Sequence, residues 1–334
     1  MTSYAAKLIQ KRDKGLCGDP ERVDDDGVVR AQVAELARLV RSSRHCIVHT
    51  GAGISTSAGV HDFRGPDGVW TRQQRKLPPL HGVAFGDAVP TITHMAIVAL
   101  VRAGLVKHVV SQNVDGLHVR SGLPRQHLCE VHGTAFAEWC DQRLPKCQCE
   151  FRRADEVATI GLRPTGNACK RCGGPLRDLL CDWDSNLPQD EVEYAIEQHR
   201  MADLAICVGT SLRIRPAGLW PLRTIRLNGK KEPGRICVIN LQKTHLDRRC
   251  AVRIFARCDH VFTMLMDELG VDIPKWVAVE CPYAKLGWRP TDRNPSADVA
   301  DRHAGDDDAG STGSSAAPTE DGKSDDDSGY TPDR

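Results

Sequence analysis

Several hallmarks of common protein classes are missing from this 334-residue sequence. No run approaches the roughly 20 apolar residues of a membrane-spanning helix, so we expect no membrane span. We also expect no secretion signal, because the N-terminal region is interrupted by basic residues: Lys7, Lys11, Arg12 and Lys14. These absences favour a reducing compartment, where the clusters among the 14 cysteines are more often metal ligands than disulfides.

The formal net charge of +1 is small, but it conceals two regions of opposite sign. Residues 301–334 contain ten Asp/Glu and three Lys/Arg, a charge of −7, which leaves +8 on residues 1–300. Residues 301–334 also lack aliphatic periodicity and are rich in Gly, Ser, Asp and Pro, and we expect a disordered acidic tail over residues 277–334. The basic body suits an acidic or nucleic-acid-associated partner.

Apolar runs that end in small polar residues recur along the chain and predict an α/β fold. The expected strands are 46–48, 106–110, 204–208 and 236–239, and a further short strand-like run is 128–131. The expected helices are 28–43, 93–103 and 260–269. Such a pattern is typical of a doubly wound, Rossmann-like parallel sheet that binds ligands beyond the carboxyl ends of its strands.

The cysteine-rich region 140–187 interrupts this rhythm and is expected to be a smaller inserted module. The predicted organisation is an N-terminal extension over 1–27, a main domain over 28–276 and the acidic tail over 277–334. Within the main domain, residues 28–139 and 188–276 would form the Rossmann-like part.

A glycine-rich segment, HTGAGISTSAGVHDFRG, follows the first predicted strand and is a candidate phosphate-binding loop. It departs from the GxGxxG fingerprint, because Gly51 and Gly53 are followed only later by Gly59. No acidic residue closes a clear second strand about 20 residues further on. A glycine-rich turn without ligand therefore remains an alternative. The segment ends in an acid, an aromatic and a cation, Asp62-Phe63-Arg64, which a plain turn does not need.

The spacing of five cysteines predicts a structural zinc site. Cys169 and Cys172 form a CxxC knuckle followed by two glycines. The upstream cysteines are irregularly spaced. Cys140 and Cys147 fit best as the other two zinc ligands, and Cys149 is an alternative to Cys147. Four thiolates leave no open position, so the metal would not be catalytic. Free thiols packed as small apolar groups are the alternative.

His132-Gly133 follows the short strand-like run 128–131. It lies downstream of the polar segment 112–116, QNVDG, which comes after the expected strand 106–110. A single histidine is ordinarily a surface or core residue. Here, however, it can serve as a general base, because its pKa is near neutrality and the adjacent glycine permits close approach of a ligand.

Together these motifs resemble the sirtuin family. GAGIS, DFRG, QNVDGLH, the His-Gly pair, the zinc knuckle, GTSLRIRP and INLQ occur in this order, and the resemblance spans about residues 4–276. Within the family the sequence is most similar to the nuclear sirtuin-6 type, class IV. The motifs GLCGDPE and FRGPDGVWT, and Asp182-Trp183 where other classes have Phe-Gly, support that subgroup.

The resemblance implies that NAD binds as a co-substrate and that specific residues contact it. The implied NAD-binding residues are Ala52, Gly53, Thr56, Asp62, Phe63, Arg64, Trp70, Gln112, Asp115, Gly209, Ser211, Asn240, Gln242 and Cys258. Asn113 and His132 are the implied catalytic residues, and Asp182 and Trp183 are expected to contact the substrate. Two departures are His61, where the family usually has proline before DFRG, and the stretched interval between Cys140 and Cys147.

The implied reaction is removal of an acyl group from lysine, which yields nicotinamide and 2′-O-acyl-ADP-ribose. In that scheme His132 deprotonates a ribose hydroxyl. The resemblance also implies acylated lysine peptides, notably histone tails, as substrates, association with chromatin and location in the nucleus. Two alternatives remain open: mono-ADP-ribosyl transfer, and a non-catalytic NAD-binding scaffold.

Overall fold

The computed structural model describes Tyr4, Leu8 and residues 14–141, 147, 149–227 and 229–278. Nearly all of the expected acidic tail, together with most of residues 1–13, lies outside the described residues.

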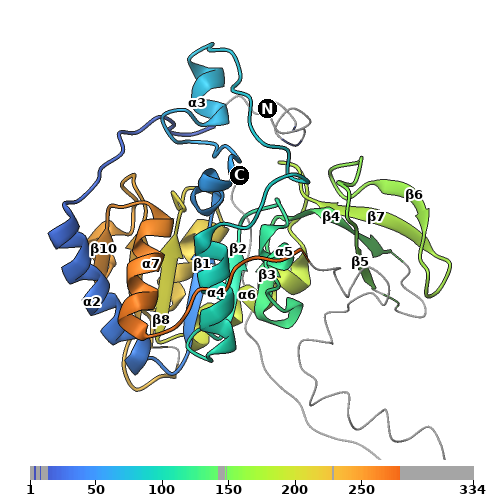
Figure 1. Cartoon of the computed structure of the whole chain (residues 1–334). Coiled ribbons are helices and arrows are strands. Elements are labelled where there is room, and N and C mark those ends of the chain that lie inside the picture. The colour runs from blue at the N-terminus through green and yellow to red at the C-terminus, as the bar shows by residue number, and fades with distance from the viewer. Residues whose placement is uncertain are drawn as a thin grey trace, which may run out of the picture. The chain divides into compact units, whose positions relative to one another are not determined.

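The larger sheet has six strands in the order β10-β9-β8-β1-β2-β3, and every neighbouring pair is parallel. Its strands are β1 (Cys46–Thr50), β2 (His108–Ser111), β3 (Leu128–Glu130), β8 (Leu204–Val208), β9 (Arg235–Ile239) and β10 (Val252–Ile254). The chain order therefore runs outward in both directions from the β1/β8 pair, which is the Rossmann arrangement with its switch point between those strands (Figure 1). The predicted fold class is confirmed.

Continuous apolar sequence accounts for the central strands. All five residues of β1 and of β8 are buried, as expected for parallel strands covered on both faces. The edge strands β3 and β10 have only three residues each, too few to establish a periodicity. Four strands and the strand-like run at β3 were therefore predicted, whereas β10 was not.

Three helices cover one face of this sheet: α2 (Asp26–Ser42), α4 (Ile92–Arg102) and α7 (Cys258–Leu269) (Figure 1). Their apolar stripes share one core with side chains of β1, β8 and β9, including Leu36, Leu100 and Phe262, all of which are fully buried. Helix α6 (Gln189–Met201) and the 3₁₀ segment η4 (Ala217–Arg223) pack on the opposite face, where Ala195 and Trp220 meet Val110. Helix α6 was not predicted, because its sequence QDEVEYAIEQHRM has few apolar residues.

The smaller sheet is antiparallel, with the strand order β5-β4-β7-β6. Its strands are β4 (Gly133–Cys140), β5 (Glu150–Arg152), β6 (Pro164–Ala168) and β7 (Pro175–Leu180). The cysteine-rich region belongs to this sheet, but the sheet begins at Gly133, upstream of the expected start of the module at Cys140. It lies beside the β3 edge of the larger sheet (Figure 1).

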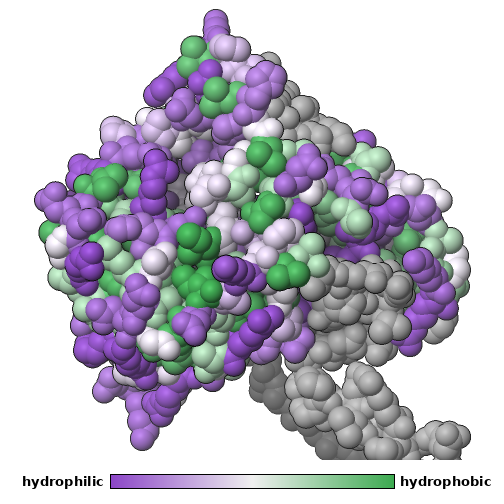
Figure 2. Space-filling model, in the orientation of Figure 1, coloured by the Kyte–Doolittle hydropathy of each residue, from purple (hydrophilic) through white to green (hydrophobic). Residues whose placement is uncertain are grey.

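Short elements lie in the loops that connect these strands and helices: η1 (Ala52–Ile54), η2 (Thr56–Ala58), α3 (Val69–Gln74), α5 (Leu117–Arg120), η3 (Arg125–His127) and η5 (Asp247–Arg249). On the face drawn in Figure 2, hydrophobic residues occur in small separate groups among hydrophilic ones. Within the described ranges, every helix is too short or too polar to cross a membrane.

Candidate functional site

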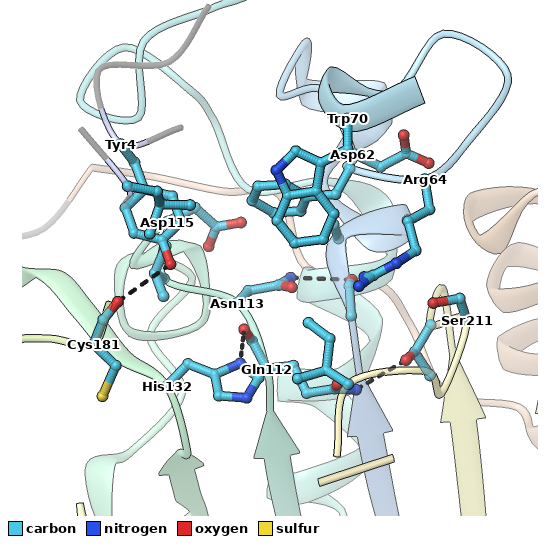
Figure 3. A pocket seen from close by; sticks show the side chains of 18 of the residues that line it. Tyr4, Asp62, Arg64, Trp70, Gln112, Asn113, Asp115, His132, Cys181 and Ser211 are labelled. Carbon is cyan, nitrogen blue, oxygen red and sulfur yellow. Dashed lines mark hydrogen bonds between the residues drawn. The ribbon is translucent and has the colours of Figure 1, made fainter. Parts of the chain in front are cut away.

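A cavity of about 640 Å³ lies where the carboxyl ends of β1, β2, β8 and β9 meet, close to the switch point of the larger sheet. Its volume falls within the usual range for small-molecule sites. The predicted site residues that line it are Ala52, Gly53, Asp62, Phe63, Arg64, Trp70, Gln112, Asn113, Asp115, His132, Asp182, Trp183, Gly209, Ser211, Asn240 and Gln242. Segments far apart in the sequence thus contribute to one site (Figure 3).

The glycines after β1 are required by a close crossing of two loops. A Cβ on Gly53 would lie 2.8 Å from Gly209 Cα, and one on Gly51 would lie 2.7 Å from Thr210 Cβ. The Gly53 amide donates to the Gly209 carbonyl at 2.8 Å, and the Gly51 amide donates to Val208. Because both amides already donate to backbone carbonyls of the protein, these two glycine amides do not form a phosphate-binding loop of the simple kind.

An aromatic wall closes one side of the cavity. The ring centroid of Trp70 lies 4.5 Å from that of Phe63 and 5.1 Å from that of Trp183. The guanidinium of Arg64 stacks on Trp70 at 4.4 Å (Figure 3). Burial lowers the pKa of Arg64 to about 10, so this side chain remains cationic at neutral pH beside the aromatic wall.

Asp62 stabilises the loop that carries Phe63 and Arg64. Its carboxylate accepts the Gly65 amide at 3.1 Å, and its backbone oxygen accepts the Val69 amide at the start of α3. The preceding residue, His61, is hydrogen-bonded through Nε2 to the His81 carbonyl at 3.2 Å. His61 therefore joins two loops at the rim of the cavity, where the family usually has proline.

A buried polar cluster lies beneath the aromatic wall. Ser55 Oγ donates to Asp115 at 2.6 Å, and the Asn113 amide donates to the Gly51 carbonyl at 3.1 Å. Burial raises the pKa of the Asp115 carboxyl, whereas the hydrogen bonds from Ser55 and from the Leu117 amide lower it. These bonds fix the side chains of Asn113 and Asp115 before any ligand binds.

Gln112 and His132 stand side by side at the base of the cavity (Figure 3). Nδ1 of His132 lies 2.9 Å from the Gln112 backbone oxygen, which can only accept a hydrogen bond. The proton of the neutral ring therefore resides on Nδ1 and Nε2 is basic. Burial lowers the pKa of His132, so the ring is neutral at physiological pH.

Gly133 has a different role from the one expected. The sequence suggested that it allows a ligand to approach, but the close neighbour is strand β7. A Cβ on Gly133 would lie 1.4 Å from the Leu179 carbonyl oxygen, and φ is +75°. Only glycine fits here, because it starts β4 against β7 directly after His132.

The remaining nucleotide-binding candidates divide into two groups. Asn240 and Gln242 line the cavity, and the Gln242 amide also donates to the Asp19 and Arg64 carbonyls at 2.7 and 3.1 Å. Thr56 and Cys258 are not among the residues that line it: Thr56 is exposed on η2, and Cys258 is buried at the start of α7.

Four cysteines of the smaller sheet meet at one point. The sulfur atoms of Cys140, Cys147, Cys169 and Cys172 all lie within 4.8 Å of one another. The Cys140–Cys172 and Cys147–Cys169 distances are 3.4 and 3.6 Å, close to the roughly 3.8 Å expected between thiolates that share a tetrahedral zinc ion. Cys149 lies outside this group and accepts from Arg171. The four-cysteine group thus fits one structural zinc ion.

Two residues that line the cavity, Thr210 and Tyr4, were missed in the sequence analysis. Thr210 has a recognisable signal, because it stands between two predicted site residues at the end of β8. Tyr4 has none: its hydroxyl donates to the Cys181 carbonyl, and its ring packs edge-on against Phe63, far away in the sequence.

Comparison with known proteins identifies the family. Residues 80–216 match the Sir2 family. The NAD-dependent protein deacetylase Sirt6 of Drosophila melanogaster is 40% identical over 289 residues, which cover 84% of this chain and 88% of the relative. The chain belongs to the Sir2, or sirtuin, family.

This sirtuin also resembles longer relatives and solved structures. The NAD-dependent protein deacetylase SRT1 of Arabidopsis thaliana is 44% identical over 280 residues, which cover 83% of this chain but only 57% of the relative. This sirtuin therefore spans little more than half the length of that plant protein. A solved structure of a Sir2 protein with a p53 peptide and NAD⁺ is 28% identical with a TM-score of 0.53, and the match covers 71% of this sirtuin and 98% of that chain. The similarity to Sirt6 confirms the subgroup indicated by the sequence.

Proposed function

We propose that this sirtuin is an NAD-dependent protein-lysine deacylase that acts on acetyl or longer acyl groups and releases nicotinamide and 2′-O-acyl-ADP-ribose. Family membership supports the proposal, as do relatives named NAD-dependent protein deacetylases and a structural neighbour that holds NAD⁺ with a peptide. The observation that carries it is the basic Nε2 of His132, set beside Gln112 and Asn113 in the cavity.

The side chains that line the cavity have separate roles in the proposed reaction. When bound, NAD would supply an ADP-ribosyl group, whose bond to nicotinamide would break as a bond forms from the ribose to the acyl oxygen of the lysine. The aromatic wall of Phe63, Trp70 and Trp183 excludes water from the end of the cavity that would hold nicotinamide. The Arg64 cation, stacked on Trp70, holds negatively charged phosphate. His132 accepts a proton from a ribose hydroxyl at Nε2, while its Nδ1–H stays bonded to Gln112.

We infer that the protein substrate is basic, which favours histone tails, association with chromatin and a nuclear location. The rim of the cavity near α6 is acidic: Asp182 lines the cavity, and Asp190 and Glu193 are exposed on the same helix as the lining residue Gln189. Lysine-rich peptides would be attracted to this rim.

One assay tests the proposal. The protein is incubated with NAD and with acetylated, myristoylated or unmodified histone-tail peptides, and nicotinamide release and peptide mass are measured. The proposal expects release that depends on an acylated peptide, with loss of the acyl mass. Gain of an ADP-ribosyl mass would instead establish mono-ADP-ribosyl transfer, and no peptide-dependent release would reject the deacylase.

A further inference from the structure

A chain of hydrogen bonds runs from the cavity through the sheet into α6. The Gln112 side-chain amide lies 3.0 Å from His49 Nε2, and His49 Nδ1 lies 3.1 Å from His199 Nε2. His199 Nδ1 in turn lies 2.7 Å from the Ala195 carbonyl oxygen. Both imidazoles are fully buried, on β1 and α6 respectively.

The Ala195 carbonyl fixes the direction of every bond in this chain. A carbonyl oxygen can only accept, so His199 must carry its proton on Nδ1. Burial lowers the pKa of His199 to about 4 and also lowers that of His49, so both rings are neutral and hold one proton each. His199 Nε2 therefore accepts from His49 Nδ1, and His49 Nε2 accepts from Gln112.

The consequence for Gln112 is a fixed orientation of its amide. Its nitrogen lies 3.0 Å from His49 Nε2, 2.9 Å from Thr210 Oγ1 and 3.4 Å from the Thr50 carbonyl oxygen, so its two hydrogens are shared among these acceptors. Among the described residues no donor is paired with the side-chain oxygen of Gln112. That oxygen is the acceptor that this residue presents to the cavity.

We propose that His49 and His199 are positioning residues that hold the Gln112 amide so that its oxygen accepts hydrogen bonds from ribose hydroxyls of the bound nucleotide. The identity of that nucleotide rests on the proposed function. If every hydrogen bond in this series ran in the opposite direction, the Gln112 amide nitrogen would face the ribose. Two acceptors, His199 Nδ1 and the Ala195 oxygen, would then face each other. The Ala195 carbonyl of α6 thus acts together with the Thr50 carbonyl to select which atom of Gln112 faces the cavity.

The first test reads the proton positions directly and needs no ligand. Two-dimensional ¹⁵N–¹H NMR spectra of the histidine rings, recorded on the full chain at neutral pH, distinguish the two neutral forms. Assignment uses the variants His49→Gln and His199→Gln. The proposal expects the Nδ1–H form for both rings, and an Nε2–H or doubly protonated ring at either position would overturn it.

The second test measures NAD binding by calorimetry with matched variants. His199→Leu removes the acceptor for His49 and should weaken NAD binding about three- to tenfold, the usual effect of one lost hydrogen bond. His199→Gln can still accept from His49 and should restore binding to within about twofold of wild type. His108→Leu removes another buried imidazole, one that contacts Cys129, and should leave NAD affinity unchanged.

Each result has a distinct meaning. Wild-type affinity in His199→Leu, or equal weakening in His199→Gln and His199→Leu, would overturn the positioning role. Absence of NAD binding by the wild-type protein would refute the proposed function instead, while the NMR spectra would still decide the direction of the hydrogen bonds.

Discussion

Nδ1 of His132 and the backbone oxygen of Gln112 are 2.9 Å apart, and this single contact determines which ring nitrogen of His132 is basic. The acceptor belongs to the residue that directly follows β2, whereas the donor lies between β3 and β4. The basic nitrogen of His132 is therefore set by a backbone carbonyl next to the larger sheet rather than by a carboxylate partner.

The pH dependence of the reaction should reflect the environment of His132. Burial lowers the pKa of His132, although its bond to the Gln112 carbonyl acts in the opposite direction. Because only the neutral ring accepts a proton, kcat/KM should fall on the acidic side with a midpoint below about 6.5, the ordinary histidine value. Nicotinamide release measured from pH 4.5 to 9 checks this. A midpoint above 6.5 would contradict it, and His132→Asn should lose about 10²–10⁴-fold of the activity.

Removal of one zinc ligand should release the metal and loosen the smaller sheet. Cys169→Ala deletes a member of the four-cysteine group, whereas Cys149→Ala deletes a buried cysteine outside it. Metal analysis by mass spectrometry should find about one zinc per chain in the wild type and in Cys149→Ala, and almost none in Cys169→Ala. Zinc retained in Cys169→Ala but lost from Cys149→Ala would show that the ligand set is wrong.

A buried ionic network should contribute strongly to stability. Arg125 binds Glu150 of β5 at 3.0 Å and Glu191 of α6 at 2.9 Å, and all three side chains are buried. Arg125→Met leaves two buried carboxylates without this partner and should lower the free energy of unfolding by about 3–5 kcal/mol. Urea denaturation measures the change. Arg38→Met, which breaks the exposed Arg38–Glu35 pair, is the control and should leave the midpoint near that of wild type.

Glycine at position 133 should be essential for activity. Gly133→Ala would force a Cβ into the Leu179 carbonyl, so β4 and the adjacent His132 must shift. A displacement of about 1 Å at a catalytic group costs about a hundredfold in rate. Gly270→Ala has a similar positive φ but meets nothing within 4 Å, so it isolates backbone strain from the clash. Equal activity of the two variants would refute the steric explanation.

The sequence was most informative for elements that neighbouring residues along the chain are sufficient to define. Central strands such as β1 and β8 are buried over their full length, so their apolar runs sufficed to locate them. The zinc ligands followed from their spacing, but the choice between Cys147 and Cys149 depended on chain geometry. Helix α6 remained unseen because side chains such as His199 and Glu191 are polar yet buried, and only their distant partners explain that burial.

For the site, the sequence identified residues but not their contacts. Gly53 was correctly placed at the cavity, yet its reason for being glycine is the passing backbone of Gly209. The roles of His49 and Tyr4 depend on His199 and Cys181, each at least 150 positions away along the chain. No local pattern carries such information, because these contacts exist only once the chain has folded.

The two sheets are joined at β3 and β4 by only two residues, Val131 and His132, since β3 ends at Glu130 and β4 begins at Gly133. A connection this short places the His132 imidazole directly between the two sheets, so its position depends on how they are aligned. The residue that we propose as the proton acceptor therefore lies at the junction of the two sheets. We therefore expect loss of zinc to disturb the position of His132, although none of the four cysteines lines the cavity.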